Sequence, residues 1–243
     1  MAVRSLYVEP ERPTLELDWP ALEFRDVFRI YRSGPVETVA LRGLDLRVEP
    51  GQFVAILGPS GSGKSTLLGL AAGLDEPSAG EIRFGDLSLA RMADDELARL
   101  RARKMALILQ SDNLWPTLSA RENVAASLRL AGHPDPRPAA LQALAEFGLR
   151  DRADRRAGAL SGGEQQRVAI AAAAARRASL VLADEPTGEL DAANERIVLD
   201  ALKRLRDDHG STIVTVTHSE QVAAAADRVV QMRDGRVVSE GSL

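Results

Sequence analysis

The chain has 243 residues, with 31 lysines and arginines against 35 aspartates and glutamates, and a formal net charge of −4. This near balance argues against broad electrostatic binding to nucleic acid, and the absence of cysteine excludes disulfides, thiolate metal sites and cysteine nucleophiles. The longest apolar run, 168–175, is far shorter than the ~20 residues of a membrane span, and no signal peptide is visible, so we expect a cytoplasmic protein.

The order of the predicted elements indicates the fold class. Residues 1–20 contain three prolines and are expected to form an N-terminal extension before a domain at 21–243. Apolar patterns predict strands over 22–27, 44–48, 53–57, 105–109, 180–183 and 212–217, and a hairpin over 229–238. Helices are predicted over 65–73, 94–103, 168–178 and 194–206, with 111–160 mostly helical around a surface loop at 133–138. Strands that alternate with helices indicate an α/β fold with a mostly parallel sheet.

A glycine-rich loop follows the buried strand 53–57 and matches the pattern G-x-x-x-x-G-K-[ST]. Its glycines let backbone N–H groups wrap a phosphate, the lysine supplies a positive charge, and the hydroxyl after it suits Mg²⁺. A flexible turn that merely precedes a lysine is the alternative, but the predicted strand and helix on either side favour nucleotide binding. The candidate phosphate ligands are Gly58, Ser60, Gly61, Gly63, Lys64, Ser65 and Thr66.

A second candidate phosphate site precedes the alanine-rich helix, in the sequence Leu-Ser-Gly-Gly-Glu-Gln-Gln-Arg at 160–167. Ser161 and Glu164 have the spacing of a capping box, which explains both residues as helix geometry. A capping box does not explain two glycines in the first turn, where they weaken a helix. They make sense if an anion must approach the bare N–H groups there.

Together with the loop at 58–65, this motif resembles the signature of ATP-binding cassette (ABC) ATPases, and the resemblance covers about residues 22–241. It implies a P-loop NTPase core, an N-terminal antiparallel β-subdomain and a helical subdomain at about 111–160. It also implies a head-to-tail dimer that encloses ATP between the phosphate loop of one subunit and the signature of the other. Ser161 and Gly163 would then touch the γ-phosphate in the partner's site.

Two acids follow the apolar strand 180–183, and ligands of open α/β sheets bind at the carboxyl ends of strands. Asp184 is placed to hold Mg²⁺, and Glu185 to orient or deprotonate the attacking water. The alternative is an acidic turn or helix cap. The resemblance supports the catalytic assignment for both residues.

Four further residues take their roles from the resemblance, because each has an ordinary structural explanation. His218 ends the strand 212–217 and would sense the γ-phosphate and support Glu185. Gln110 would otherwise be a polar strand terminus; the resemblance makes it contact Mg²⁺ or water and report to a membrane partner. Tyr31 would stack on adenine, and Asp191 would lie at the dimer interface, although it could simply cap the next helix.

The sequence from Ala183 to Asp191 resembles the branch that serves lipoprotein release, macrolide export and cell-division transporters, the MacB/LolD type. It departs from that branch at Glu189, where asparagine is usual, and at Ala172, Asp112 and Trp115. The implied function is an ATP-hydrolysing subunit that drives a separate permease from the cytoplasmic face of the membrane, paired with itself or a related ATPase. The alternatives are a mechanotransmitter that regulates an extracellular activity without transport and, least favoured, an ABC protein of nucleic-acid or ribosome work.

Overall fold

The computed structural model describes residues 20–34 and 36–241, so the predicted extension lies outside the described residues except for Pro20. A central sheet has the strand order β10-β9-β3-β8-β7-β6. Its strands are β3 (Phe53–Leu57), β6 (Met105–Ile108), β7 (Leu180–Asp184), β8 (Thr212–Val216), β9 (Arg228–Arg233) and β10 (Arg236–Gly241). All neighbouring pairs are parallel except the β9–β10 hairpin. The predicted α/β class and parallel sheet are confirmed.

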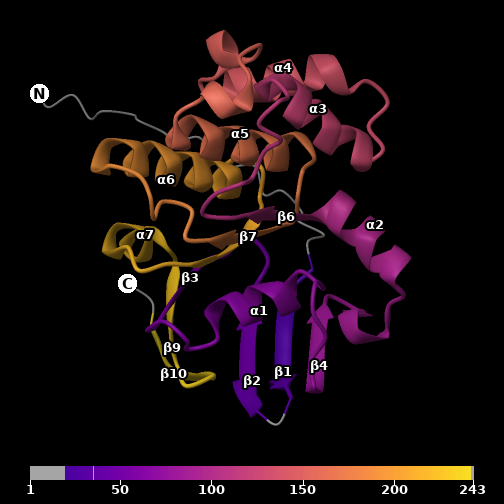
Figure 1. The fold of residues 1–243 in the computed structure, drawn as a ribbon, viewed down its shortest axis with the longest axis vertical. Helices are drawn as coiled ribbons and strands as arrows, with labels where there is room; N and C mark the ends of the chain where they lie inside the picture. The colour runs from indigo at the N-terminus through magenta and orange to yellow at the C-terminus, as the bar shows by residue number, and fades with distance from the viewer. Residues whose placement is uncertain (1–19, 35, 242–243) are drawn as a thin grey trace, which may run out of the picture.

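An antiparallel sheet with the order β2-β1-β4-β5 lies below the central strands β6 and β7 in the view of Figure 1. It contains β1 (Leu22–Ser33), β2 (Val36–Val48), β4 (Ala79–Phe84) and β5 (Leu87–Ser88). The register of β1 and β2 places Tyr31 opposite Thr38. This register brings the end of a long hairpin close to the phosphate loop.

Helices cover both faces of the central sheet. They are α1 (Lys64–Ala71), α2 (Asp94–Lys104), α3 (Ala120–Leu130), α4 (Pro136–Glu146), α5 (Gly162–Ala175), α6 (Ala192–Asp207) and α7 (Glu220–Ala225), with 3₁₀ turns at Leu89–Arg91, Arg150–Arg152 and Ala157–Ala159. Helix α1 lies between the two sheets, while α5 and α6 lie on the opposite face (Figure 1). Because the pleat alternates, Val54 and Ile56 join the core under α1, whereas Phe53 and Ala55 join the core under α5 and α6.

Several predicted boundaries were wrong for local reasons. The signature helix runs from Gly162 to Ala175. Its start agrees with the predicted capping box at Ser161 and not with the alanine-rich range 168–178, because the Ser161 cap outweighs the low helix propensity of the two glycines. Pro136 opens α4 instead of lying in a loop, since a first-turn proline lacks only an N–H that would have no partner in the helix. Strand β4 and helix α7 had no counterpart in the prediction.

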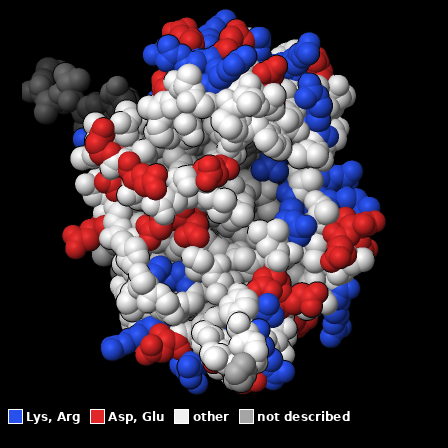
Figure 2. Space-filling model, viewed as in Figure 1, with Lys and Arg blue, Asp and Glu red and all other residues white. Residues whose placement is uncertain are grey.

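The surface of the face in Figure 2 carries both signs of charge. Basic and acidic side chains alternate over the upper helices and over the edge near α2 (Figure 2). Within the described residues, no helix combines the length and the apolar character that crossing a bilayer requires.

Candidate active site

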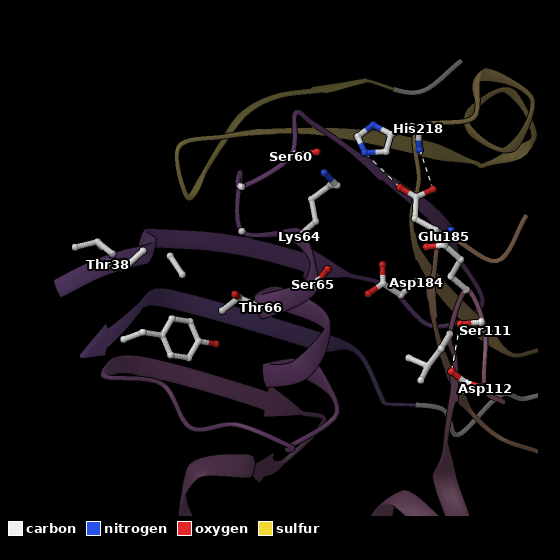
Figure 3. A pocket seen from close by; sticks show the side chains of 17 residues that line it. Thr38, Ser60, Lys64, Ser65, Thr66, Ser111, Asp112, Asp184, Glu185 and His218 are labelled. Carbon is white, nitrogen blue, oxygen red and sulfur yellow. Dashed lines mark hydrogen bonds and ion pairs between the residues drawn. The ribbon is translucent and has the colours of Figure 1, made fainter. Parts of the chain in front are cut away.

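One cleft of about 750 Å³ lies where the parallel strands β3, β6, β7 and β8 end. Since the carboxyl ends of parallel strands meet at one sheet edge, residues far apart in the chain converge there. The predicted site residues that line it are Tyr31, Ser60, Gly61, Gly63, Lys64, Ser65, Thr66, Gln110, Asp184, Glu185 and His218. Gly58, Ser161, Gly163 and Asp191 do not line it. Figure 3 shows the labelled side chains arranged around this cleft.

The phosphate loop connects β3 directly to α1. Gly63 caps α1 with φ 99°, a left-handed conformation that favours glycine. Gly58 is required for packing, since a Cβ there would lie 2.2 Å from the carbonyl oxygen of Met232. The Lys64 side chain is 8% exposed, and its Nζ donates to the carbonyls of Gly58 at 2.7 Å and Pro59 at 3.0 Å. The lysine charge is therefore held at the centre of the loop, beside the N-terminus of α1.

The acidic pair lies at the carboxyl end of β7. Asp184 is the last residue of the strand, and Figure 3 shows its carboxylate and the Ser65 hydroxyl pointing toward one another. Glu185 leaves the strand with φ 46°, a conformation that is strained for a residue with a side chain and that turns its carboxylate into the cleft. Its backbone N–H still donates to the Val216 carbonyl at 3.0 Å, which fixes Glu185 to the neighbouring strand β8.

His218 contacts Glu185 with both its backbone and its ring. The His218 N–H donates to Glu185 Oε2 at 3.2 Å, and His218 Nε2 lies 3.4 Å from Glu185 Oε1 (Figure 3). The His218 side chain is 57% exposed, so the ring borders open space in the cleft. The loop after β8 thus holds the carboxylate that follows β7.

The donor set of the cleft fits Mg²⁺. Ser65, Asp184 and Gln110 line it together and offer a hydroxyl, a carboxylate and an amide oxygen. Mg²⁺ prefers oxygen ligands and usually combines one or two protein groups with phosphates and water. Among the described residues no cluster of three histidine or acidic side chains could hold a metal by itself. The three oxygen donors line the same cleft as the phosphate loop, which suits a cation that binds together with a phosphate ligand.

Gln110 is held by contacts that the sequence did not reveal. Its Nε2 donates to Glu189 Oε1 at 3.3 Å. The buried side chain of Gln166, on the signature helix, donates from Nε2 to the carbonyls of Leu109 and Gln110, each at 2.8 Å. Gln166 lies within the signature motif, but only the fold brings it beneath this loop.

The other end of the cleft is formed by the antiparallel sheet. Tyr31 is 40% exposed, and its hydroxyl donates to Asp75 Oδ2 at 2.8 Å. The Arg29 guanidinium lies 4.5 Å from the centre of the Tyr31 ring and pairs with Asp75 at 2.6 Å. Further lining residues were not predicted: Thr38, Val39, Ala40, Leu109, Ser111 and Asp112. Residues 38–40 reach the cleft through pairing with β1, which no local pattern reveals.

The signature segment forms the predicted capping box outside the cleft. Ser161 Oγ accepts from the Glu164 N–H at 3.3 Å, and Glu164 Oε2 accepts from the Ser161 N–H at 2.9 Å. That backbone hydrogen bond lowers the pKa of Glu164, and Arg152, which pairs with it at 2.8 Å, lowers it further. Gly163 packs against the start of α6, since a Cβ there would lie 2.8 Å from Asn194 Oδ1.

Asp191 caps α6, which is the simpler of the two roles that the sequence suggested for it. Its Oδ1 accepts from the Asn194 N–H at 2.8 Å, and this bond lowers the pKa of the Asp191 carboxyl. Asp191 and Ser161 are both exposed. These two caps lie outside the cleft that Lys64 occupies.

Comparison with known proteins identifies the family. Residues 41–188, more than half of the chain, match the ABC transporter family. The chain is 43% identical over 225 residues to the lipoprotein-releasing system ATP-binding protein LolD of Anaeromyxobacter dehalogenans, covering 91% of this chain and 94% of that protein. It is 44% identical over 223 residues to the macrolide export ATP-binding/permease protein MacB of Azoarcus sp., and spans 34% of the length of that relative.

Among solved structures, the fold matches the ATP-binding cassette MJ0796, in a dimeric post-hydrolysis state with ADP and Pi, with a TM-score of 0.84 and 37% identity. The match covers 91% of this chain and 98% of that one. These findings confirm the predicted resemblance and the predicted ATPase fold. The chain belongs to the ABC transporter family and is an ATP-binding cassette that hydrolyses ATP.

Proposed function

We propose that two copies of this chain enclose two ATP molecules, and that ATP-driven closure drives a separately encoded membrane permease. The observation that carries the proposal is the division of the predicted site. The phosphate loop, the acidic pair, Gln110 and His218 share one cleft, whereas Ser161 and Gly163 lie outside it. An ATP bound in the cleft would be completed by the signature of a second copy.

Within one subunit, the phosphate loop binds the triphosphate through its backbone N–H groups and Lys64, with α1 adding the positive end of its dipole. Tyr31 stacks on the adenine at the far end of the cleft. Mg²⁺ would be held by Ser65 and Asp184, and by Gln110 either directly or through a water molecule. The bound ion would supply positive charge next to the β- and γ-phosphates. The oxygen donors that line the cleft together support this assignment.

Glu185 orients or deprotonates the attacking water, and His218 senses the γ-phosphate and holds Glu185. The contacts between these residues support both roles, because a base must be fixed relative to the reacting atoms. The exposed His218 ring also lines the cleft, where its nitrogens are available to a phosphate. Catalysis here consists mainly of positioning and charge stabilisation.

The second copy contributes Ser161 and Gly163 to the γ-phosphate, and Asp191 lies at the same interface. Each cap is exposed, which leaves these helix ends accessible to a partner subunit. The dimeric state of the related cassette supports a head-to-tail pair. We assign the partner as a second copy rather than a related ATPase, because this chain carries both halves of the site.

The domain at 21–243 carries residues 111–160 as an inserted helical subdomain, and Gln110 at its start reports nucleotide state to the permease. The protein then works at the cytoplasmic face of the membrane, held there by that permease. Relatives that are named for macrolide export and lipoprotein release favour a transporter over a mechanotransmitter. A transport assay in vesicles that contain the copurified permease separates the two functions.

The direct test of the catalytic assignment is Glu185→Gln. We expect ATP turnover to fall about 100-fold or more while ATP binding persists, because only the base is altered. The control is Glu220→Gln, an exposed acid at the start of α7. Unchanged turnover in purified Glu185→Gln protein would remove the assignment.

A further inference from the structure

We propose that Glu195, on helix α6, is a positioning residue that fixes the loop of Glu185 relative to the loop of His218. The proposal rests on the roles proposed above for Glu185 and His218. Glu195 does not line the cleft and acts through its neighbours. Its half-buried carboxylate lies between two segments that come from different strands.

The first contact reaches the segment after β7. Thr187, two residues beyond Glu185, is 4% exposed, and its hydroxyl donates to Glu195 Oε1 at 3.3 Å. The same segment turns tightly, with the Gly188 N–H donating to the Glu185 carbonyl at 3.0 Å. A shift of Thr187 would therefore be transmitted to Glu185, whose backbone is already strained at φ 46°.

The second contact reaches the segment after β8. Ser219, the residue next to His218, donates from Oγ to the same Glu195 oxygen at 2.5 Å. Ser219 also accepts from the Val222 N–H at 3.2 Å, and its own N–H donates to Thr217 Oγ1 at 3.0 Å. The hydroxyl thus donates to α6 and accepts from α7, and it ties the residue next to His218 to both helices.

Glu195 Oε1 on α6 therefore accepts hydrogen bonds from both segments, the one that carries Glu185 and the one that carries His218. In the cleft itself the two segments meet through two long contacts to the Glu185 carboxylate. The His218 N–H donates to Oε2 at 3.2 Å, and the exposed ring places Nε2 3.4 Å from Oε1. A fixed acceptor behind both segments limits their relative movement. Small displacements of a catalytic base are costly to rate, so we expect Glu195 to act on turnover more than on ATP affinity.

A different explanation is that Glu195 only stabilises α6, since an acid in the first turn interacts favourably with the helix dipole. The two explanations differ in what Glu195→Gln does. Glutamine loses the charge but keeps an oxygen that can accept from both hydroxyls. Alanine loses both.

The kinetic test compares Glu195→Ala, Glu195→Gln and Thr187→Val, with Asp200→Ala as an exposed acid control on the same helix. We expect kcat of Glu195→Ala to fall roughly tenfold with KM for ATP within about twofold, because the phosphate loop is untouched. Glu195→Gln should recover most of that loss. Thr187→Val removes one donor and should reproduce part of it, with an effect that is not additive with Glu195→Ala.

A second readout does not depend on ATP. The chain has three histidines, so their ring signals in a proton–carbon NMR spectrum can be assigned individually. We expect Glu195→Ala and Thr187→Val to shift the His218 signals, and to leave those of His133 and His209 in place. If the wild-type chain failed to hydrolyse ATP, the proposed function would be contradicted, while this measurement would still test the positioning role of Glu195.

Two results would overturn the inference. One is an unshifted His218 signal with an unchanged kcat in Glu195→Ala and Thr187→Val. The other is an equal loss of activity in Glu195→Ala and Glu195→Gln together with an equal fall in melting temperature, which would mean that charge on the helix, not the shared acceptor, matters. The Thr187→Val variant, which conserves volume, keeps the test decisive should the Glu195 variants fold poorly.

Discussion

Two helices of this chain begin at a glycine-rich motif, but only α1 opens into the cleft. Helix α1 follows the phosphate loop directly, and Lys64 at its first position is buried within that loop. Helix α5 begins with an exposed serine cap, and Gly163 in its first turn packs against Asn194 of α6. The comparison teaches that similar motifs at two helix ends can face different surfaces: the start of α1 builds the cleft, whereas the Ser161 cap of α5 is exposed outside it, where the proposed function places a second copy.

The largest expected effect comes from removing the lysine of the phosphate loop. Lys64→Ala should weaken ATP binding and lower ATPase activity about 100-fold or more, since it removes the charge held at the centre of the loop. Binding of a fluorescent ATP analogue and phosphate release measure the two losses. Lys203→Ala on α6 is the matched control, and equal losses in both variants would contradict the special position of Lys64.

Ser161→Asp should separate binding from turnover. Aspartate caps a helix as well as serine does, so the fold should persist, but its charge would repel a triphosphate brought by the second copy. We expect ATPase activity to fall about tenfold or more while the monomer binds ATP with unchanged affinity. Wild-type turnover in Ser161→Asp would show that this helix end does not meet the nucleotide.

The two signature glycines should respond differently to alanine. A Cβ on Gly163 would lie 3.1 Å from Asn194 Cβ, whereas on Gly162 the nearest atom is Leu190 Cδ2 at 3.3 Å. Asn194 cannot move freely, because its amide donates to Asp191. We expect Gly163→Ala to lower the free energy of unfolding by about 1 kcal/mol and Gly162→Ala by less, as measured by urea denaturation. A larger loss in Gly162→Ala than in Gly163→Ala would contradict the close packing of Gly163 against Asn194.

The smallest effect concerns pH and the capping box. The folded-state pKa of Glu164 is lower than its ordinary value of 4.5, so the carboxylate adds stability above that pH. This contribution is lost as pH falls through the lowered pKa. Wild type should exceed Glu164→Gln by about 0.5 kcal/mol at pH 7, and the difference should shrink below about pH 4. Urea denaturation at several pH values measures it, and a difference independent of pH would contradict the assignment.

The sequence predicted the parts of the site that depend on local order. The strand 53–57 matches β3, and Asp184 ends β7 as expected, because continuous apolar runs and the motifs after them are contiguous in the chain. Strand β4 escaped prediction because it lies in the antiparallel sheet with a glycine near its start and charged residues along it. Sequence patterns there resemble those of a loop.

The supporting contacts could not be predicted, because they depend on tertiary packing. Gln166 reaches the loop of Gln110 across more than fifty residues, and Glu195 meets Ser219 from another strand connection. Thr38 enters the cleft only through its register with Tyr31. Periodicity and motif spacing carry no information about such pairs until the sheet order is known.

The most direct measurement of the two-copy site is the ATP-dependent association state of Glu185→Gln, in which slow hydrolysis retains the nucleotide. Sedimentation velocity should show a monomer without ATP, a dimer with saturating Mg²⁺-ATP, and a monomer again when Ser161→Asp is added to Glu185→Gln. A Glu185→Gln chain that stays monomeric at saturating ATP, or one that dimerises equally well with Ser161→Asp, would contradict a nucleotide clamped between two copies.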